Sequence, residues 1–463
     1  MKQPMDLTKG NVWKQLMKFA LPLFLANLLQ SLYGMVDMAV VGRYVGSAAL
    51  AALSNATMIV FILTAVCIGV TMGGSVLVAQ YRGARDEDGQ LGSIGTLFAL
   101  TGAAALVITV LSLLTFERVL TMMGLPAESM PHAVEYLRVI CMGTVFVFGY
   151  NAVCSILRGM GDSKSPLYFV AVAAAVNVVL DFVLVGAAGM GTSGAAWATV
   201  LSQAVSFGVS LLRLRRTLKG FQRKKGALKP QGKLAWTILK IGLPSAVQSA
   251  VVNVAFLLVT CILNKYGVVV AAAAGVGLKV ATFLAMPCWA AGQSVMTMVG
   301  QNMGAGEITR ASSVSRAGLV LSLASTGIMV LFVQLFAPGI IGLFDQNPAV
   351  IREGVLYLRI FCSVSSFAYA AMYHFDSFAT GVGAAVLAMV NALLEGIVLR
   401  LGLIFLFETV LGLGRIGVYL GQMLSTFPPA VIGLLYFLRG SWKCRRLIDQ
   451  NTAQQLDEEA QLE

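Results

Sequence analysis

The chain has 463 residues, of which 58% are hydrophobic and 12% are charged, and its formal net charge at pH 7 is +12. Ordinary globular domains carry about a quarter charged residues, so this composition excludes a soluble globular domain. The positive charge does not call for a nucleic-acid partner, because no stretch of the sequence has the composition of a folded soluble domain.

Hydrophobic runs of about twenty residues recur along most of the chain, each long enough to cross a hydrocarbon core ~30 Å thick. They are rich in Ala, Leu and Gly and rarely alternate with period two, which indicates helices rather than barrel strands. Twelve spans are predicted, at 16–38, 50–79, 91–114, 134–157, 166–188, 193–212, 236–262, 268–300, 314–337, 354–380, 384–409 and 414–438. The sequence therefore predicts an all-α integral membrane protein.

The basic residues predict the orientation of these spans. With both termini inside, the inner segments carry 24 of the 33 Lys and Arg residues and the outer segments carry seven. This excess places both termini in the cytoplasm. The most basic stretch, 213–233, lies between spans six and seven, where we interpret it as a topology determinant beside anionic headgroups. We expect contacts with membrane lipids and none with nucleic acid.

Five short blocks of the first half recur in the same order in the second half, at offsets of 221 to 223 residues. The pairs are ALP at 20–22 with GLP at 242–244, QxxGA at 80–84 with 301–305, YLR at 136–138 with 357–359, GMG at 159–161 with GVG at 381–383, and GMGxxG at 189–194 with GLGxxG at 412–417. Each half holds six spans, so the repeats are parallel, and such repeats build two lobes around a central cleft.

This repeat predicts the domain organisation. We expect an amino-terminal lobe of helices 1–6 at 1–212 and a carboxy-terminal lobe of helices 7–12 at 236–440. A basic cytoplasmic linker at 213–235 joins them, and a Gln- and Glu-rich, disordered cytoplasmic tail occupies 441–463.

A charge at membrane depth costs roughly 2.5–3.5 kcal/mol on insertion scales, so each one calls for a reason. Asp37 lies in span one and Asp181 in span five, with Asn177 four residues earlier on the same helical face. Thr199 of span six reaches a similar depth, and Asn151 of span four lies deeper. These groups offer hard oxygen ligands for Na⁺ and a carboxyl pair able to hold a proton. The alternative is that they only cap or bridge helices.

The second half carries a different polar set, comprising Gln248, Lys279, Asp376, Glu395 and Arg400. Lys279 must find an acid or reach water, and Asp376 and Glu395 are the available partners. One hypothesis is a charge-neutral structural network among these spans. The other is that Lys279 and Asp376 bind substrate or couple protons. His374, two residues from Asp376, is weak evidence for a proton relay.

Other motifs are absent from the sequence. The seven cysteines lack metal-ligand spacing and are typical of packing residues. There is no HExxH and no GxSxG motif, which argues against a membrane-embedded enzyme. We expect no cofactor and a monomeric chain. Pro22 in span one is either a tolerated kink or a hinge that lets this span bend.

Five segments carry a family resemblance: VDMAVVGRYVG at 36–46, AALSNA at 51–56, VAQYRGA at 78–84, LRGMGD at 157–162 and GAAWAT at 194–199. They resemble recurrent motifs of the multidrug and toxic compound extrusion (MATE) family, and the resemblance covers nearly the whole chain. It implies two pseudo-symmetric six-helix lobes and alternating-access export of mostly amphipathic organic cations. The coupling ion would be Na⁺ or H⁺, and the location a bacterial cytoplasmic (inner) membrane.

The resemblance also implies a site. The family's amino-lobe cation site matches Asp37, Asn151, Asn177, Asp181 and Thr199, and the span-one proline matches Pro22. Bound Na⁺ would then lie at Asp37, Asn177 and Asp181. Some branches use a glutamate in span seven, whereas this span has Gln248 and no acid, so a carboxy-lobe cation site of that kind is not expected.

The nearest alternative function is a flippase for a lipid-linked saccharide or another amphipathic, lipid-like substrate. Such a protein would line its cavity with several basic residues for pyrophosphate, and here only Lys279 and Arg400 qualify. A passive channel is a second alternative, and it would need no repeat-related lobes.

Overall fold

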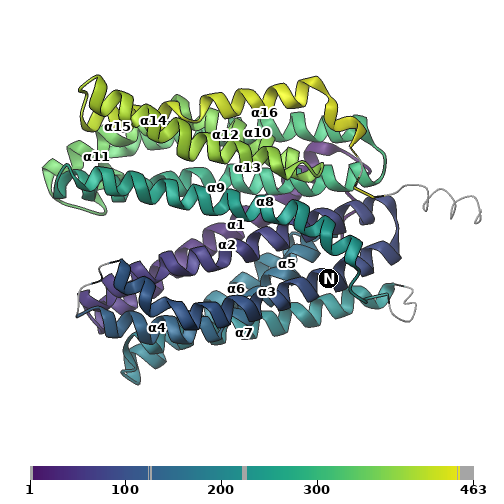
Figure 1. The fold of residues 1–463 in the computed structure, drawn as a ribbon, viewed down its shortest axis with the longest axis horizontal. Coiled ribbons are helices and arrows are strands. Elements are labelled where there is room, and N and C mark those ends of the chain that lie inside the picture. The colour runs from purple at the N-terminus through teal and green to yellow at the C-terminus, as the bar shows by residue number, and fades with distance from the viewer. Residues whose placement is uncertain (1–3, 124, 126–127, 222–226, 446, 449–463) are drawn as a thin grey trace, which may run out of the picture. The chain divides into compact units, whose positions relative to one another are not determined.

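The computed structural model describes residues 4–123, 125, 128–221, 227–445 and 447–448. In this part of the chain all regular secondary structure is helical, without strands (Figure 1). Within it, ten helices are long and apolar enough to cross a membrane. Two further pairs of helices, each bent by 50°, pass the same test as pairs and raise the number of spans to twelve. The all-α membrane fold predicted from the sequence is confirmed.

The spans of the first repeat follow the predicted order. They are α1 (Val12–Tyr44), α2 (Ser47–Ala84), α3 (Glu87–Met122), the bent pair α4 (Met130–Met142) and α5 (Thr144–Gly159), α6 (Lys164–Leu180) with the π-helix η1 (Asp181–Ala187), and α7 (Gly191–Thr217). A 3₁₀ turn, η2 (Leu218–Gly220), ends α7.

The second repeat has the same plan. Its spans are α8 (Gly232–Asn264), α9 (Val268–Gly304), α10 (Ile308–Gly342), and the bent pair α11 (Pro348–Phe361) and α12 (Val364–Gly381). They continue with α13 (Ala385–Leu393), η3 (Leu394–Leu399), α14 (Arg400–Phe405) and η4 (Leu406–Val410) in one span, then α15 (Arg415–Leu424) with α16 (Phe427–Arg439), and the 3₁₀ turn η5 (Ser441–Cys444).

Equivalent breaks and turns support the repeat. The bent spans break at Gly143 in the first half and beside Ser363 in the second, close to the predicted offset. Gly161 and Gly383 end equivalent GxG blocks, and both have positive φ values, 94° and 86°. Left-handed backbone is the conformation for which glycine is suited, so these blocks recur because the same turn recurs.

Contact clustering divides the chain into two compact units, which we call unit 1 and unit 2. Unit 1 is built mainly from Leu21–Ala246, and unit 2 from Thr8–Ala20 and Val247–Leu447. Unit 1 therefore contains most of the first repeat and unit 2 most of the second. The long helices α1 and α8 each have residues in both units.

Two predicted segments differ from the structure. Helix α7 continues to Thr217, five residues into the predicted linker, and residues 222–226 of that linker lie outside the described part. The predicted disorder does not hold for the start of the tail, where Trp442 is 1% exposed and its indole donates to the Phe437 carbonyl oxygen over 3.0 Å. Trp442 also packs edge-on against Phe378. Burial of this large aromatic side chain orders the segment; residues 449–463 lie outside the described part.

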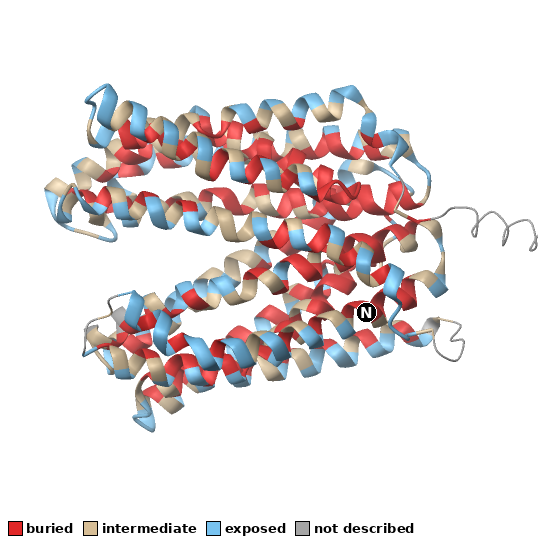
Figure 2. Ribbon diagram, in the orientation of Figure 1, coloured by how far each residue is buried: buried red, intermediate tan, exposed pale blue. Residues whose placement is uncertain are grey.

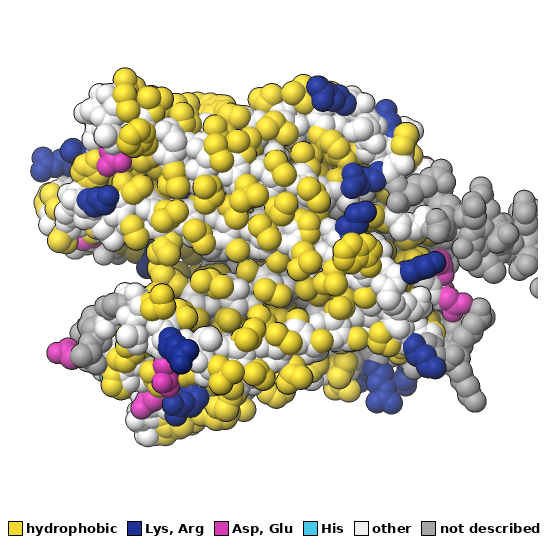
Figure 3. All heavy atoms as spheres, viewed as in Figure 1, with side chains coloured by type: hydrophobic (Ala, Val, Ile, Leu, Met, Phe, Trp, Pro, Cys, Tyr) yellow, Lys and Arg dark blue, Asp and Glu magenta, His cyan; other side chains and the backbone are white. Residues whose placement is uncertain are grey.

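Each unit has buried residues where its helices pack together and exposed residues on the outer faces of the helices (Figure 2). The exposed residues include many large apolar side chains. On α3, one face exposes Leu106, Val107, Val110, Leu111 and Leu114. Figure 3 shows hydrophobic side chains over the middle of the helices, with charged side chains near the helix ends. An exposed apolar surface of this kind is suited to lipid tails rather than water.

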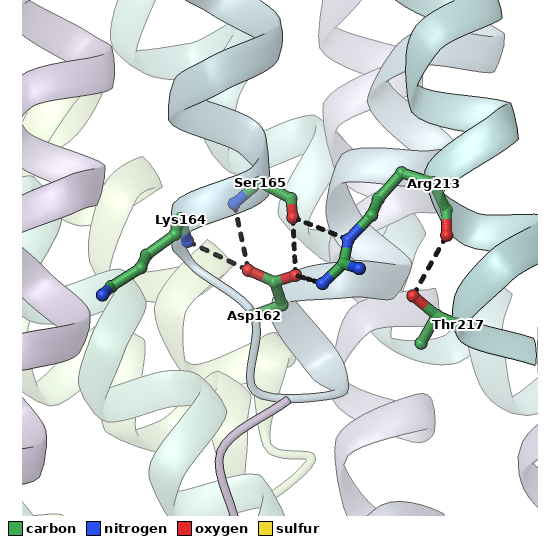
Figure 4. A network of polar contacts seen from close by, with 5 residues as sticks. All are labelled: Asp162, Lys164, Ser165, Arg213 and Thr217. Atoms are coloured by element: carbon green, nitrogen blue, oxygen red, sulfur yellow. Dashed lines mark hydrogen bonds and ion pairs between the residues drawn. The ribbon is translucent and has the colours of Figure 1, made fainter. Parts of the chain in front are cut away.

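A polar network in unit 1 joins the turn before α6 to α7 (Figure 4). Asp162 accepts hydrogen bonds from the backbone N–H groups of Lys164 and Ser165 over 3.1 and 3.0 Å, as a capping residue does. Its Oδ2 also accepts from the Ser165 hydroxyl and from Nη2 of Arg213. The network fixes the start of α6, the helix that ends one residue before Asp181.

Candidate cation-binding site

The candidate site lies wholly within unit 1 and is centred on Asp181. This residue begins η1, directly after α6, and is completely buried. Asn177 lies four residues earlier on α6 and is 1% exposed. Asp37, on α1, is half-buried, and its carboxylate is close enough to that of Asp181 for their charges to interact. The structure therefore brings together three of the five predicted ligand residues.

These three side chains have oxygen atoms without a hydrogen-bond partner among the described residues: Oδ1 of Asp37, Oδ1 of Asn177, and both carboxylate oxygens of Asp181. A buried carboxylate without a donor or a counter-charge is costly. The cluster therefore has the composition of a site that is completed by a cation. Oxygen atoms from carboxylate and amide groups suit Na⁺, and the paired carboxylates can alternatively share a proton.

The backbone changes type at this point. At Asp181 the helix passes from α to π geometry, in which hydrogen bonds join residues five apart. The Asp181 N–H still reaches the carbonyl oxygens of Asn177 and Val178. Single π turns in otherwise α-helical segments occur frequently at functional sites, because they change the direction in which a side chain points.

The structure adds residues that the sequence analysis did not select. Tyr33, one turn before Asp37, lies close to Gln203 of α7 and interacts electrostatically with Asp37. Tyr136 of α4 is 7% exposed and interacts electrostatically with both acids and with Tyr33. The spacing of four residues between Tyr33 and Asp37 was a usable signal, whereas the proximity of α4 depends on tertiary packing.

The other two predicted ligands, Asn151 and Thr199, form hydrogen bonds within their own helices. The Asn151 amide donates to the Val147 carbonyl oxygen of its own helix over 2.8 Å. Thr199 is half-buried, and its carbonyl oxygen accepts from the Ser202 hydroxyl. Among the described residues, no hydrogen bond joins either side chain to the carboxylates. Pro22 lies buried within α1, in unit 1.

Unit 2 holds a second buried polar group. Oδ1 of Asp376 accepts from the Asn391 amide over 2.7 Å, and Oδ2 accepts from the Gln248 amide over 3.5 Å. Glu395 forms an ion pair with Arg400, both side chains being 3% exposed. Oε1 of Glu395 also accepts from the hydroxyl of Ser425 over 3.3 Å. Four of the five predicted residues of this network thus lie in hydrogen-bonded or ion-paired contacts.

Lys279 is the exception. Its side chain is exposed, and within the described part of the chain it forms no ion pair. The buried cation of the network is Arg400. Lys279, for which the sequence left open an acidic partner or contact with water, forms an ion pair with neither Asp376 nor Glu395 in the described part of the chain. His374 is completely buried, and its Nε2 lies 3.1 Å from the Ser315 hydroxyl oxygen. Among the described residues it forms no hydrogen bond with Asp376 or Glu395.

No group of three or more His, Cys, Asp or Glu side chains that could hold a metal ion occurs among the described residues. Twelve apolar spans in two repeats, with a buried acid and a second carboxylate beside it inside one of them, are the features of a secondary membrane transporter rather than an enzyme. The MatE family profile matches residues 22–183 and again residues 244–406, once in each repeat. The chain belongs to the multidrug and toxic compound extrusion (MATE) family.

Comparison with individual proteins agrees with this assignment. The chain is 31% identical over 362 residues to the probable multidrug resistance protein YoeA of Bacillus subtilis, covering 76% of this chain and 78% of the relative. It is 28% identical over 446 residues to YpnP of the same organism, covering 96% and 99%. Its fold matches a solved structure of a multidrug resistance MATE transporter of the MOP superfamily with a TM-score of 0.90 at 22% identity, covering 96% and 100%.

Proposed function

We propose that this protein is a cation-coupled antiporter that exports amphipathic, mostly cationic organic compounds by alternating access. The observation that carries the proposal is the cluster of Asp37, Asn177 and Asp181, in which four buried oxygen atoms have no hydrogen-bond partner among the described residues. The relatives named as multidrug resistance proteins support the substrate class.

The coupling ion is Na⁺ or H⁺, taken up at Asp37 and Asp181. A bound cation removes the repulsion between the two carboxylates, so the conformation around α1 that suits the occupied site differs from the one that suits the empty site. Pro22 lies in α1 and provides a place where that helix can bend. Release of substrate follows because ion and substrate favour different conformations.

The driving force depends on the charge of the exported compound. One net charge that moves down ~100 mV supplies about 2.3 kcal/mol, which corresponds to a concentration ratio of roughly fifty-fold for a compound without net charge. Exchange of one coupling ion for one monovalent organic cation moves no net charge, so there the concentration gradient of the coupling ion drives export. We further propose a monomer in the bacterial cytoplasmic membrane with both termini in the cytoplasm, which the excess of basic residues in the inner segments supports.

The test is efflux of a fluorescent organic cation in proteoliposomes, with a Na⁺ gradient and a pH gradient imposed separately. We expect one gradient to drive transport, and Asp37→Asn and Asp181→Asn each to abolish it. Glu128→Gln, at an exposed acid, is the matched control and should transport normally. If neither gradient moves any cationic dye, the proposal fails, and flipping of a lipid-linked saccharide becomes the next assay.

A further inference from the structure

Unit 2 contains a counterpart of the unit 1 cluster that the five repeated blocks do not reveal. In unit 1, Asn177 precedes Asp181 by four residues, and Asp181 begins η1. In unit 2, Asn391 precedes Glu395 by the same four residues, and Glu395 is the second residue of η3. Both acids lie in the fifth span of their repeat, yet the second pair stands about two helical turns earlier in register.

The two clusters differ in which atoms lack partners. In unit 1 the atoms without a partner include the carboxylate oxygens of Asp181. In unit 2 the corresponding carboxylate, Glu395, has partners in Arg400 and Ser425, and Asp376 beside it accepts from two amides. The unpartnered atoms there include Nε and Nη1 of Arg400. Among the described residues of unit 1, the one charged group that acts on Asp181 is another acid, Asp37, whereas Glu395 in unit 2 is paired with an arginine.

The π-helix explains how Arg400 reaches Glu395. Residues five apart on an α-helix point ~140° away from each other, because each residue turns the helix by ~100°. In a π-helix the i to i+5 hydrogen bond brings such residues onto one face. The residue five positions after Asp181 is Gly186, where an added Cβ would lie 3.3 Å from the ring of Tyr44. The first repeat therefore has a glycine in close contact with Tyr44 where the second has an arginine.

We propose that unit 2 contains a second cation site of the Asn-x-x-x-acid type, which the protein keeps filled with its own guanidinium, that of Arg400, in the place of a coupling ion. Removal of that charge opens a site for a monovalent metal cation, Na⁺, on Glu395 and Ser425 with Asp376 nearby. This inference rests on the proposed function only in that the unit 1 cluster is taken as the pattern of a cation site.

The surroundings of Arg400 suit a tethered ion. Its guanidinium carbon lies 4.8 Å from the centre of the Phe256 ring, a cation–π contact. Its only ionic partner among the described residues is Glu395. The guanidinium of Arg400 is thus held by one carboxylate and one aromatic ring, and part of its hydrogen-bonding capacity is unused. Arg213, in contrast, donates to both Asp162 and Ser165.

The experiment measures binding of radioactive Na⁺ to the purified full-length protein, with Asp181→Asn present throughout so that unit 1 does not contribute. Adding Arg400→Gln should produce saturable binding of roughly one Na⁺ per chain. Adding Glu395→Gln as well should remove it. Arg400→Lys, which keeps a tethered charge, and Arg415→Gln, which removes the arginine of an exposed ion pair, should bind no extra Na⁺.

Thermal melting decides the case if Arg400→Gln weakens the fold. A cation that binds the folded state stabilises it, so the variant should melt higher in NaCl than in choline chloride, and the background variant should not. Equal melting in both salts, or no gain in Na⁺ binding, overturns the inference. All these variants carry Asp181→Asn, so Na⁺ binding in unit 2 is measured without the unit 1 acid. The result therefore stays valid even if the parent protein shows no gradient-driven efflux.

Discussion

Arg213 donates through Nη2 to Oδ2 of Asp162 over 3.1 Å, and this ion pair ties α7 to the turn that starts α6. The two side chains are 17% and 9% exposed. The pair between Arg138 and Glu117, by contrast, has side chains 60% and 62% exposed. Hydrogen bonds to charged groups contribute more when water is excluded, so the two pairs should differ in their effect on stability.

Arg213→Ala should therefore lower the free energy of unfolding by about 2 kcal/mol, since Asp162 would be left as a largely buried acid with one donor fewer. Arg138→Ala is the matched control and should change it by less than about 1 kcal/mol. The measurement is the melting temperature of each purified variant in the same detergent. Equal shifts for the two variants would show that burial does not set the strength of these pairs.

Close packing in unit 1 yields a second prediction. An added Cβ at Gly73 of α2 would lie 2.3 Å from the Ile238 carbonyl oxygen, and one at Gly69 would lie 2.4 Å from that of Gly242. Small residues four apart allow helices to approach closely in membranes. Gly73→Ala must push backbone apart, and overpacking of this kind costs about 1–3 kcal/mol.

The control for Gly73→Ala is Gly102→Ala on α3, where an added Cβ meets nothing within 4 Å. That variant should melt at or slightly above the parent temperature, because alanine favours helix more than glycine does. A normal melting temperature for Gly73→Ala would contradict the backbone contact with Ile238.

The positions of the twelve spans could be predicted because membrane thickness fixes how long an apolar run must be. The 50° bends in the fourth and tenth spans could not. The breaks fall at Gly143 and beside Ser363, which are not prolines, and the apolar pattern continues through both. Sharp bends occur at glycine and serine as well as at proline. With 48 glycines in the chain, the sequence does not show which of them interrupt a helix.

The candidate site was predictable where it lies on one helix. The spacing of Asn177 and Asp181 gave a shared face directly. The partner of Glu395 was not predictable from the sequence. On an α-helix the side chain of Arg400 would point away from Glu395, so Lys279 was an equally good candidate for the cation. The π-helix η3 instead brings the two side chains onto one face, and the sequence of residues 394–399 does not predict a π-helix.

Asp181→Asn should abolish coupled export and also raise the melting temperature. Both carboxylate oxygens of Asp181 are buried without a partner among the described residues, and Asp37 repels them. A neutral amide in that position costs less to bury, by about 1 kcal/mol or more. Gradient-driven efflux and thermal melting of the same preparation check the two halves of this prediction.

The matched comparison is Asp376→Asn in unit 2. Asp376 accepts from the amides of Asn391 and Gln248, so an amide in its place would turn a donor towards a donor. This variant should melt below the parent protein. If both variants melt lower, the unpartnered oxygens of Asp181 are not a source of instability.

Tyr136→Phe tests whether the tyrosine beside the acids contributes to ion binding. Its buried side chain interacts electrostatically with Asp37 and Asp181, so a phenol dipole lies next to the charge that the ion must balance. Loss of one such polar interaction is worth about 0.5–1.5 kcal/mol. The coupling-ion concentration at half-maximal efflux should therefore change by roughly two- to ten-fold. The maximal efflux rate and the melting temperature should stay near those of the parent protein.

Tyr168→Phe, at a position 55% exposed on α6, removes a phenol away from the acids and is the control. It should leave the half-maximal concentration unchanged. A structural role for Tyr136 would instead lower its melting temperature and the maximal rate together, with the ion dependence unaltered. Because the two explanations move different measured quantities, one titration of efflux against ion concentration, combined with one melting curve, distinguishes an ion-binding residue from a packing residue.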